Sequence, residues 1–581
     1  MNSALLRVAA PRHLDETYFP VVVVGAGPTG LTLANLLGTY GVRTLTLERS
    51  ANVLDEPRAV SIDDESLRTL QAANVVEDVV KQIVNGYGTW YYSWRGKKFA
   101  EVEPTTTEYG FQKRNAFRQE VLVGRLRDSL KRFEHASLWF EHEVVRFVDE
   151  GNSVLLTVKH ADGIKHVRCD WLVACDGGRS GTREQLGISL VGKTYDKRWL
   201  IVDLVGRMSP FRHTRTFCDP ARPAIRLPGP EGTLRYEFML HDHEDPEKAL
   251  DEACVRTWIR ARDPGDADLP ITRKVVYTFH ARVANRWRAG RVLLAGDAAH
   301  LTPPFAGQGM NSGLRDVANL SWKLAAVVNS GFAPSLVDSY EEERRPHVWS
   351  LIQMAVRIGA FMQPKSAVNA MVMQAALKLV CLFPPARDYI LHLKFKPKPR
   401  FQSGFFVGSA AASLPIPAGQ LLPQPLVELQ GGTAVRLDDV LGTGFAVVVA
   451  SDAIVAEFRR ILDGARVPYR VVKIVLKAED FIVGHIQGGV DAIARDSDGV
   501  LEDIMRKAGA DVMFVRPDRY VLGYANSGDS RSIDALKQLF DCFVLPVSEG
   551  CESGSSETRH MSPSTGEGTV TAERRNRSST Y

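Results

Sequence analysis

The sequence predicts an α/β fold in which a Rossmann-like nucleotide-binding domain is interlaced with a β-sheet domain and followed by a smaller α/β domain. Three observations support this prediction. A glycine-rich turn joins an apolar run to a helical pattern within residues 18–40, and a second apolar run, ending in Gly-Asp, occupies residues 292–297. Short β-prone segments fill part of the chain between them, and strand-like and helix-like segments alternate again from residue 445.

Length and composition limit the possible functions. The chain has 581 residues, of which 45% are hydrophobic and 24% charged, and this ordinary globular usage excludes a largely disordered or collagen-like chain. A net charge of +4 over this length is too small to indicate nucleic acid or an anionic membrane as the main partner. A small-molecule ligand is therefore expected.

The sequence predicts neither export nor a structural metal. The N-terminal residues contain no continuous apolar stretch, and Asn369, Gln374 and Lys378 interrupt the most apolar helical segment, 368–383. The seven cysteines form no C-x-x-C pair and no cluster with histidine at zinc spacing. We therefore expect a cytoplasmic chain without a membrane span, a dithiol redox site or a metal.

The first chemical motif is the turn that contains Gly25, Gly27 and Gly30. The first glycine permits a sharp bend, the second lets the backbone approach a pyrophosphate, and the third allows a strand and a helix to pack closely. Glu48 follows the next apolar run, where a carboxylate can accept hydrogen bonds from a ribose. Because strand, helix and acid agree, a dinucleotide site is favoured over a glycine-rich turn without a ligand.

The second motif follows the run that begins at Leu293. Asp297 at a strand end could hold a polyol, and a helix expected over 311–328 would direct its positive dipole end toward an anionic ring edge. Taken alone, the Gly-Asp pair is common and is better explained by an aspartate that caps a helix. Between the two motifs, a hairpin at 143–160 and the separate sheet at 191–280 are expected, with a ligand pocket between sheet and nucleotide domain.

The remaining chain is predicted to be helical over 335–393, to form a linker over 395–424 and to end in a small α/β domain. The last thirty residues are rich in Ser and Thr and nearly free of large apolar side chains, so they are predicted to be disordered. The expected boundaries are 18–190 and 281–400 for the nucleotide-binding domain, 191–280 for the sheet domain, 401–548 for the last domain and 549–581 for the tail.

Three of these segments together resemble the flavoprotein aromatic hydroxylases that carry one FAD and share the p-hydroxybenzoate hydroxylase fold. The matching pieces are VVVVGAGPTGLTLANLL with Glu48, CDGGRS at 175–180, and RVLLAGDAAHLTPPFAGQGMNSGLRDVANLSWKL at 291–324. Within this family, EPRAVSIDDESLRTLQ, KRNAFRQ, CDPARP, RYEFM and LKFKPKPRF are most similar to members that hydroxylate 3-(3-hydroxyphenyl)propionate. The C-terminal α/β domain resembles the thioredoxin-like appendage of some members but lacks C-x-x-C, which implies packing or assembly, with a possible homo-oligomer.

The resemblance implies cofactor contacts residue by residue. Gly25, Gly27, Gly30 and Glu48 would hold the ADP half of FAD, with Arg58 near the pyrophosphate. A second glycine fingerprint is absent from the sequence, so NADH or NADPH would bind transiently to the same domain as a co-substrate.

The same resemblance assigns the flavin half of the cofactor. Gln119 and Asp297 would lie near the ribityl chain, Asp176 near the groove where the nicotinamide nucleotide docks, and Pro303 against the flavin face. Backbone N–H groups of three consecutive residues would hold the pyrimidine edge of the flavin: Gly309, Met310 and Asn311.

The substrate candidates come from the middle sheet. Arg222 or Arg235 could pair with a propionate carboxylate, because guanidinium geometry suits bidentate binding, and Tyr236 or His280 could polarise the phenol. For each of them, a surface ion pair or a satisfied core polar group is the alternative. His300, which follows the Gly-Asp motif, is expected to have a structural role at the strand–helix junction.

The expected reaction is therefore hydroxylation of 3-(3-hydroxyphenyl)propionate, and also of 3-hydroxycinnamate, to the 2,3-dihydroxy acid by FAD, NADH and O2. One alternative keeps the FAD-dependent hydroxylase and changes the substrate to another phenol or a polycyclic aromatic. A second alternative, from a different class, is a flavin-binding sensor without turnover.

Overall fold

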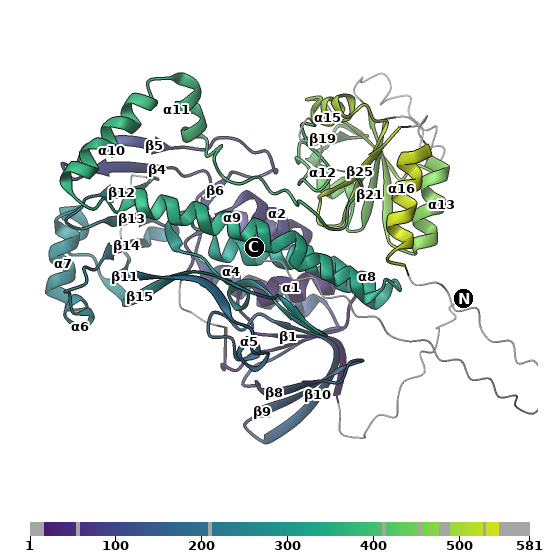
Figure 1. Cartoon of the computed structure of the whole chain (residues 1–581), viewed down its shortest axis with the longest axis horizontal. Helices are drawn as coiled ribbons and strands as arrows, with labels where there is room; N and C mark the ends of the chain where they lie inside the picture. Colours follow the sequence, from purple (N-terminus) through teal and green to yellow (C-terminus); the bar gives the residue numbers. More distant parts are fainter. Residues whose placement is uncertain are drawn as a thin grey trace, which may run out of the picture. The chain divides into compact units, whose positions relative to one another are not determined.

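The computed structural model describes residues 17–53, 58–206, 212–408, 414–450, 455–475, 489–526 and 530–544, and the tail predicted to be disordered lies outside these ranges. The described residues form three large sheets with their helices (Figure 1). Within them, no single helix is long and apolar enough to cross a membrane; α10 and α11 pass that test only as a pair, bent by 113°.

The first sheet is the predicted Rossmann-like sheet. Its strands run in the order β16-β17-β10-β1-β2-β7, with β9 and β8 added as an antiparallel hairpin at β10. Strands β17, β10, β1, β2 and β7 are parallel, so their carboxyl ends meet at one edge. The strands are β1 (Thr17–Val24), β2 (Thr44–Leu47), β7 (Ala136–Trp139), β8 (Glu143–Asp149), β9 (Val154–His160), β10 (Gly163–Ala174), β16 (Arg288–Ala289) and β17 (Val292–Leu294).

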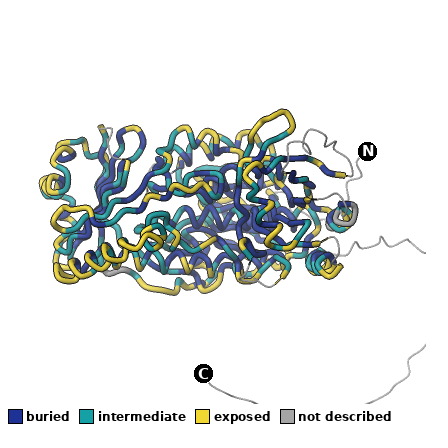
Figure 2. The backbone as a smooth tube through the Cα atoms, turned by 90° about the horizontal axis from the view of Figure 1, so that it is seen from above, coloured by how far each residue is buried: buried dark blue, intermediate teal, exposed yellow. Residues whose placement is uncertain are grey.

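Two helices follow directly from that edge of the sheet. Helix α1 (Pro28–Thr39) completes the predicted βαβ unit, and α8 (Gly309–Asn329) confirms the helix expected after the Gly-Asp motif. They pack against each other, and both are largely buried. Figure 2 shows that buried backbone fills the interior of the molecule, whereas the loops at its periphery are exposed. The shorter elements around them are β3 (Ser61–Asp63), α2 (Asp64–Ala72), α3 (Val76–Val80), β6 (Arg114–Ala116), α4 (Gln119–Ser129) and α5 (Gly181–Gln185).

The second sheet has the order β18-β15-β11-β14-β13-β12-β4-β5 and is antiparallel except between β12 and β4. It takes β4 and β5 from a part of the sequence that precedes the β-prone segments, so chain segments far apart in sequence share this sheet. Its strands are β4 (Thr89–Ser93), β5 (Lys98–Val102), β11 (Leu190–Leu204), β12 (Thr214–Cys218), β13 (Ala224–Pro228), β14 (Leu234–Met239), β15 (Ile271–Ala284) and β18 (His300–Leu301).

The two faces of the second sheet have different neighbours because side chains alternate along each strand. Leu200 and Val202 share a core with Val255 and Ile259 of α7 (Glu252–Arg260), next to the short α6 (Pro246–Ala249). Trp199 and the other side chains of the opposite face pack with Phe305, which follows the Gly-Asp motif, and with residues near the end of α9 (Asp338–Met362). We call this opposite face of the sheet, which carries Trp199, the inner face.

After α9, two further helices, α10 (Ala367–Val380) and α11 (Pro384–Leu391), pack on β5 (Figure 1). The chain then enters a mixed sheet of order β20-β19-β23-β22-β21-β24-β25, in which β21, β22 and β23 are parallel. Its elements are β19 (Leu426–Leu429), β20 (Ala434–Arg436), α12 (Leu437–Leu441), β21 (Phe445–Val449), α13 (Val455–Ala465), β22 (Tyr469–Val475), β23 (Ala492–Arg495), α15 (Val500–Ala508), β24 (Val512–Val515), β25 (Val521–Ala525) and α16 (Ser530–Asp541).

Candidate functional site

The glycine turn between β1 and α1 has no room for side chains at two of its three glycines. Gly25 has a φ of +103°, and a Cβ there would lie 2.5 Å from the carbonyl oxygen of Cys175. A Cβ on Gly30 would lie 2.0 Å from the carbonyl oxygen of Gly25. At Gly27, by contrast, a Cβ would meet no protein atom within 4 Å, so this position faces open space. The turn is therefore closed on the protein side and open where a ligand would approach.

Glu48 lies against the same turn. It follows β2, and one carboxylate oxygen, Oε2, accepts a hydrogen bond from the backbone N–H of Ala26 at 2.9 Å. The other oxygen, Oε1, accepts from the N–H of Ser50, also at 2.9 Å. The carboxylate is thus fixed beside the glycine turn, where the sequence placed it.

The second motif converges on the first through Thr29, in the first turn of α1. A Cβ on Gly296 would lie 2.7 Å from Thr29 Oγ1, and a Cβ on Gly313 of α8 would lie 2.4 Å from the same atom. Small residues therefore let α1, the Gly-Asp turn and α8 meet. Asp297 lies in this turn, where burial raises its pKa while His300 and Arg58 act in the opposite direction.

Both helices begin without a side-chain cap. The first intrahelical bond of α8 runs from Ser312 N to Gln308 O at 2.9 Å, so the N–H groups of residues 309–311 precede it. In α1, Leu31 N bonds to Gly27 O at 3.0 Å. Two uncapped helix N-termini on the carboxyl side of one parallel sheet form an environment that favours anionic groups.

Other predicted cofactor residues surround this region. Gln119 Oε1 accepts a hydrogen bond from Ala59 N at 2.7 Å, next to Arg58, which is exposed. Asp176 follows β10 and accepts from Thr182 N at 3.1 Å through Oδ2. Pro303 is buried at the start of the loop that leads to Phe305.

Asn311 and Met310 differ in how their side chains are used. Asn311 is buried, and its amide donates to the carbonyl oxygens of Ser61 at 3.1 Å and Gly307 at 2.6 Å. Its Oδ1 accepts from Asp63 N at 3.1 Å. The Asn311 side chain therefore fixes the start of α8, whereas Met310 packs half-buried against the main core.

The inner face of the second sheet carries a row of charged residues at one end. Arg235 of β14 and Arg273 of β15 both pair in register with Asp203 of β11. Arg235 donates to the Asp203 carboxylate at 2.6 and 3.1 Å and to the carbonyl oxygen of Arg58 at 2.9 Å. Arg273 Nη1 lies 3.5 Å from the same carboxylate. Two guanidinium groups therefore share one carboxylate, and Arg273 Nη2 also donates to the hydroxyl of Tyr277 at 2.6 Å.

Two residues further along the strands, the inner face becomes apolar except for one carboxyl group. Glu237 of β14 is buried between Ile201 and Ile225, its register partners. Among the described residues it has no ion-pair partner, and burial raises its pKa to about 7, although Arg235 acts in the opposite direction. The next row along the face holds Trp199, Tyr277 and Met239.

Three of the predicted substrate residues lie elsewhere. Tyr236 is on the α7 face of the sheet, where its hydroxyl donates to Asp266 Oδ2 at 2.8 Å. Arg222 contacts the Glu244 carboxylate, with its guanidinium carbon 3.9 Å from the ring centroid of Trp258 on α7. Both are thus committed to the face opposite the inner one, and the structure does not bring them toward the Gly-Asp motif.

His280 is the third residue that the structure separates from the inner face. Its Nδ1 lies 3.2 Å from Thr194 Oγ1, and strand alternation directs it away from its neighbour Phe279, which packs with Phe305. Arg235 alone of the four candidates lies on the inner face, but its charge is already paired.

Sequence reasoning missed Glu237, Arg273 and Asp203. A signal was present for Glu237, because it is an acidic residue in the otherwise apolar strand segment YEFML and alternates with Tyr236. Nothing in the sequence indicated that Asp203 and Arg273 would stand side by side, since this follows from the pairing of β11 with β15.

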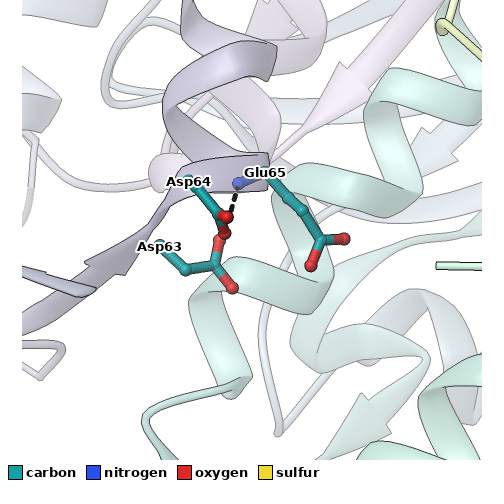
Figure 3. Close-up of side chains that lie close together, drawn as sticks. All are labelled: Asp63, Asp64 and Glu65. Carbon is teal, nitrogen blue, oxygen red and sulfur yellow. Dashed lines mark hydrogen bonds between the residues drawn. The ribbon is translucent and has the colours of Figure 1, made fainter. Parts of the chain in front are cut away.

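A cluster of buried carboxylates, Asp63, Asp64 and Glu65, stands where β3 meets α2 (Figure 3). Arg315 of α8 donates to Glu65 at 2.7 Å and also contacts Asp63, and Lys396 Nζ lies 2.7 Å from Glu65. These two cations hold the pKa of Glu65 well below its usual range, whereas burial raises that of Asp64 to about 7. The chain itself neutralises the cluster, which therefore acts as a charge network that fixes α2 against α8.

Comparison with known proteins agrees with this site. Residues 18–355 match the family described as FAD binding domain, and residues 419–539 match the HcaD C-terminal domain. A 3-(3-hydroxy-phenyl)propionate/3-hydroxycinnamic acid hydroxylase of Burkholderia cenocepacia (strain HI2424) is 36% identical over 548 residues, covering 91% of this chain and 98% of the relative. The chain belongs to the FAD-dependent aromatic hydroxylases.

A second relative and one solved structure extend the comparison. The enzyme of the same description from Mycobacterium sp. (strain JLS) is 37% identical over 93% of this chain and 94% of its own length. The crystal structure of the flavin-dependent monooxygenase PieE in complex with FAD and substrate has a TM-score of 0.75 and 21% identity, covering 91% of this chain and 100% of that one. The likeness to PieE shows that the fold is shared.

Proposed function

We propose that this protein uses NADH or NADPH and O2 to hydroxylate 3-(3-hydroxyphenyl)propionate, and also 3-hydroxycinnamate, to the 2,3-dihydroxy acid. The observation that supports the substrate class is the inner face of the second sheet. There, the guanidinium groups of Arg235 and Arg273 lie beside Asp203, two residues along the strands from the buried Glu237. Two residues of a strand span about 7 Å, close to the separation of carboxylate and hydroxyl in such an acid. The names of the relatives support the same substrate.

The residues of the first domain fit FAD. The space at Gly27 admits a pyrophosphate, and the uncapped N-termini of α1 and α8 favour its charge and that of an anionic ring edge. Asp176 Oδ1 and Thr302 Oγ1 are buried and have no hydrogen-bond partner among the described residues. A polar ligand such as FAD could supply these partners. Bound FAD supplies the hydride acceptor for the nicotinamide and the activation of O2.

In this proposal the cofactor contacts follow the sequence assignment. Gly25, Gly27, Gly30, Glu48 and Arg58 serve the ADP half. Asp176 lies near the nicotinamide nucleotide. The flavin half is contacted by Gln119, Asp297, Pro303, Gly309, Met310 and Asn311.

The residues of the chain perform three tasks in the reaction. The guanidinium groups of Arg235 and Arg273 bind the substrate carboxylate, because charge-assisted hydrogen bonds to guanidinium are strong and directional. Trp199 and Phe305, whose ring centroids are 5.5 Å apart, keep water from the aromatic ring of the substrate. Glu237 accepts the phenol proton, which makes the ring more electron-rich at the carbon beside the hydroxyl.

The C-terminal residues belong to the proposal in a structural role. We assign 401–548 to a thioredoxin-like domain, because three central parallel strands are flanked by antiparallel ones and by helices such as α13 and α15. The domain has no C-x-x-C, so its role is packing or assembly. The FAD domain is assigned to 18–190 and 281–400, and the substrate domain to 191–280, although β4, β5, β18 and the end of β15 also belong to the sheet of the substrate domain.

The decisive experiment is product identification. Purified protein loaded with FAD should consume NADH and O2 faster when 3-(3-hydroxyphenyl)propionate is present, and should release the 2,3-dihydroxy acid. A panel with phenol, 3-hydroxycinnamate and a polycyclic phenol distinguishes other aromatic substrates. Ligand binding without any hydroxylated product would instead indicate a flavin-containing sensor.

Glu237→Gln tests the proton acceptor. The wild-type rate of hydroxylation should rise with pH through about 7, because the carboxyl group must lose its proton before it can accept one. The variant should lose this dependence and about 100-fold in kcat, the lower range for a general base, with unchanged flavin content. Exposed Glu247→Gln is the matched control, and a wild-type pH profile in Glu237→Gln would exclude the role.

Arg273→Met tests recognition of the carboxylate. The KM for 3-(3-hydroxyphenyl)propionate should rise about 10-fold or more, because a hydrogen bond to a charged group contributes about 1.5–3 kcal/mol. The KM for an uncharged 3-alkylphenol should stay unchanged. Arg222→Met, on the other face of the sheet, is the control and should leave both values unaltered. Equal effects on acid and neutral phenol would exclude carboxylate binding by Arg273.

A further inference from the structure

Helix α10 and the start of α11 carry an apolar surface that the described part of the chain leaves exposed. Leu379 is 69% exposed, Leu382 77% and Phe383 63%. We call this surface the α10 patch; its large members are Val368, Met371, Val372, Leu379, Val380, Leu382, Phe383 and Tyr389. Large apolar side chains exposed in this number along one short segment indicate an interaction site.

Helix α10 is apolar on two sides, and only one of them has a partner within the described chain. Ala370 and Gln374 are buried, and Gln374 Nε2 donates to the carbonyl oxygen of Cys218 on β12 at 3.5 Å. Val372 and Leu379 point the other way and are more than 60% exposed. The side of α10 that carries Val372 and Leu379 therefore has no neighbour within the described part of the chain.

The exposed side of α10 has the spacing of a helix–helix seam. Val368, Val372, Ala375 and Leu379 follow one another at intervals of four, three and four residues, and all four are exposed. This is the pattern of apolar residues that pack into a facing helix. Ala375 is small and lies within the seam, so it allows two helix axes to approach closely.

We propose that the α10 patch is the contact between two copies of this chain, with α10 of one copy antiparallel to α10 of the other across a two-fold axis. An isologous contact of this kind is self-complementary, since Val368 of each copy meets Leu379 of the other. With full areas of roughly 150–200 Å² for side chains of this size, the patch exposes on the order of 800 Å², which is what one partner contributes to a standard interface.

A lipid surface fits the patch less well. Helices that lie in a membrane interface have one apolar face and one charged face, whereas the second face of α10 packs against the protein through Ala370 and Gln374. The exposed cations in or beside the patch are Lys365, Lys378 and Arg387, and they are spread along the segment rather than gathered on one charged face. A narrow seam with a small residue inside it favours a helix as the partner.

The test is the mass of the FAD-loaded full-length protein in solution, measured by sedimentation at micromolar concentration. The wild type should have the mass of two chains. Val372→Glu combined with Leu379→Glu should have the mass of one chain, with a dimer dissociation constant raised on the order of 100-fold or more, because unpaired charges would be buried. The flavin spectrum and the rate of NADH oxidation should stay unchanged, since neither residue belongs to the proposed site.

Two further variants keep the result specific. Ile164→Glu places the same charge at another exposed apolar position, on β10, and should stay dimeric. Ala375→Cys should give a covalent dimer on mild oxidation that is absent when Val191 is changed to Cys. A wild type with the mass of one chain, or a dimeric double variant, would overturn the proposal. Binding of a monomeric wild type to phosphatidylglycerol vesicles would assign the patch to lipid.

Discussion

Gly30→Ala should yield no folded flavoprotein, whereas Gly27→Ala should yield a folded protein that binds FAD weakly. At position 30 the new Cβ would lie 2.0 Å from the carbonyl oxygen of Gly25, a backbone atom that cannot move without opening the turn. At position 27 the backbone has a φ of −78°, which alanine adopts freely, and no protein atom lies within 4 Å of the new Cβ. Any defect in Gly27→Ala must therefore come from the ligand.

The two variants are distinguished by measuring stability and cofactor affinity separately. Apo Gly27→Ala should unfold at the wild-type midpoint by circular dichroism, with an FAD dissociation constant raised about 10- to 100-fold, since overpacking costs about 1–3 kcal/mol. Gly464→Ala, within α13 and also in open space, is the control and should bind FAD like the wild type. Wild-type affinity in Gly27→Ala would show that no phosphate approaches the turn there.

The nucleotide-binding part of the site could be predicted from the sequence because its signals are local. The glycine turn, the apolar run before it and Glu48 after β2 each depend on a few consecutive residues. Backbone hydrogen bonds then hold the strand ends together: Gly25 N donates to Leu47 O, and Ala295 N donates to Ala174 O. The sequence motifs that indicate the nucleotide ligand therefore also predict the parallel sheet.

The substrate face could not be predicted because it depends on strand register. Tyr236 and Glu237 are adjacent in the sequence, yet one is bonded to Asp266 beneath α7 and the other lies on the inner face. A shift of one residue in any pairing exchanges the two faces of a strand. The sequence offered Arg222 and Arg235 as alternatives without assigning either to a face, and only the pairing of β14 with β11 reveals Asp203 as the partner of Arg235.

The charge networks escaped prediction for a related reason. Arg315 lies 250 residues from Glu65 in the sequence, and the two meet only because α8 packs on α2. The same holds for Arg516, which follows β24 in the C-terminal sheet and reaches Glu343 on α9. From the sequence alone, such residues cannot be distinguished from ordinary surface charges, because their partners become neighbours only when the helices pack together.

Glu343→Gln should cause the largest loss of stability of any single charge-neutralising change considered. Glu343 is buried and accepts hydrogen bonds from Lys323 Nζ at 2.7 Å and from Arg516 at 2.8 and 2.9 Å. The two cations lower the pKa of Glu343 to about 2, while burial and Arg516 lower that of Lys323 to about 8. Removing the carboxylate leaves the buried Lys323 without an acidic partner and leaves Arg516 paired with Asp518 alone, which should cost about 3–5 kcal/mol.

Denaturant unfolding followed by tryptophan fluorescence measures this change, because Trp322 lies beside Arg516: its ring centroid is 5.1 Å from the guanidinium carbon. Asp503→Asn, which removes an exposed ion pair with Lys507, is the control and should cost less than about 1 kcal/mol.

The stability that Glu343 contributes also depends on pH. It is present above the unfolded pKa of Glu343, near 4, and is lost as pH falls toward 2, so the Glu343→Gln variant should lack this acid-dependent loss. Adding Lys323→Met to Glu343→Gln should recover part of the stability, because one uncompensated charge is removed. A loss below about 1 kcal/mol for Glu343→Gln would mean that Asp518 or water compensates the remaining cations, and that the packing of α8 on α9 does not depend on the Glu343 carboxylate.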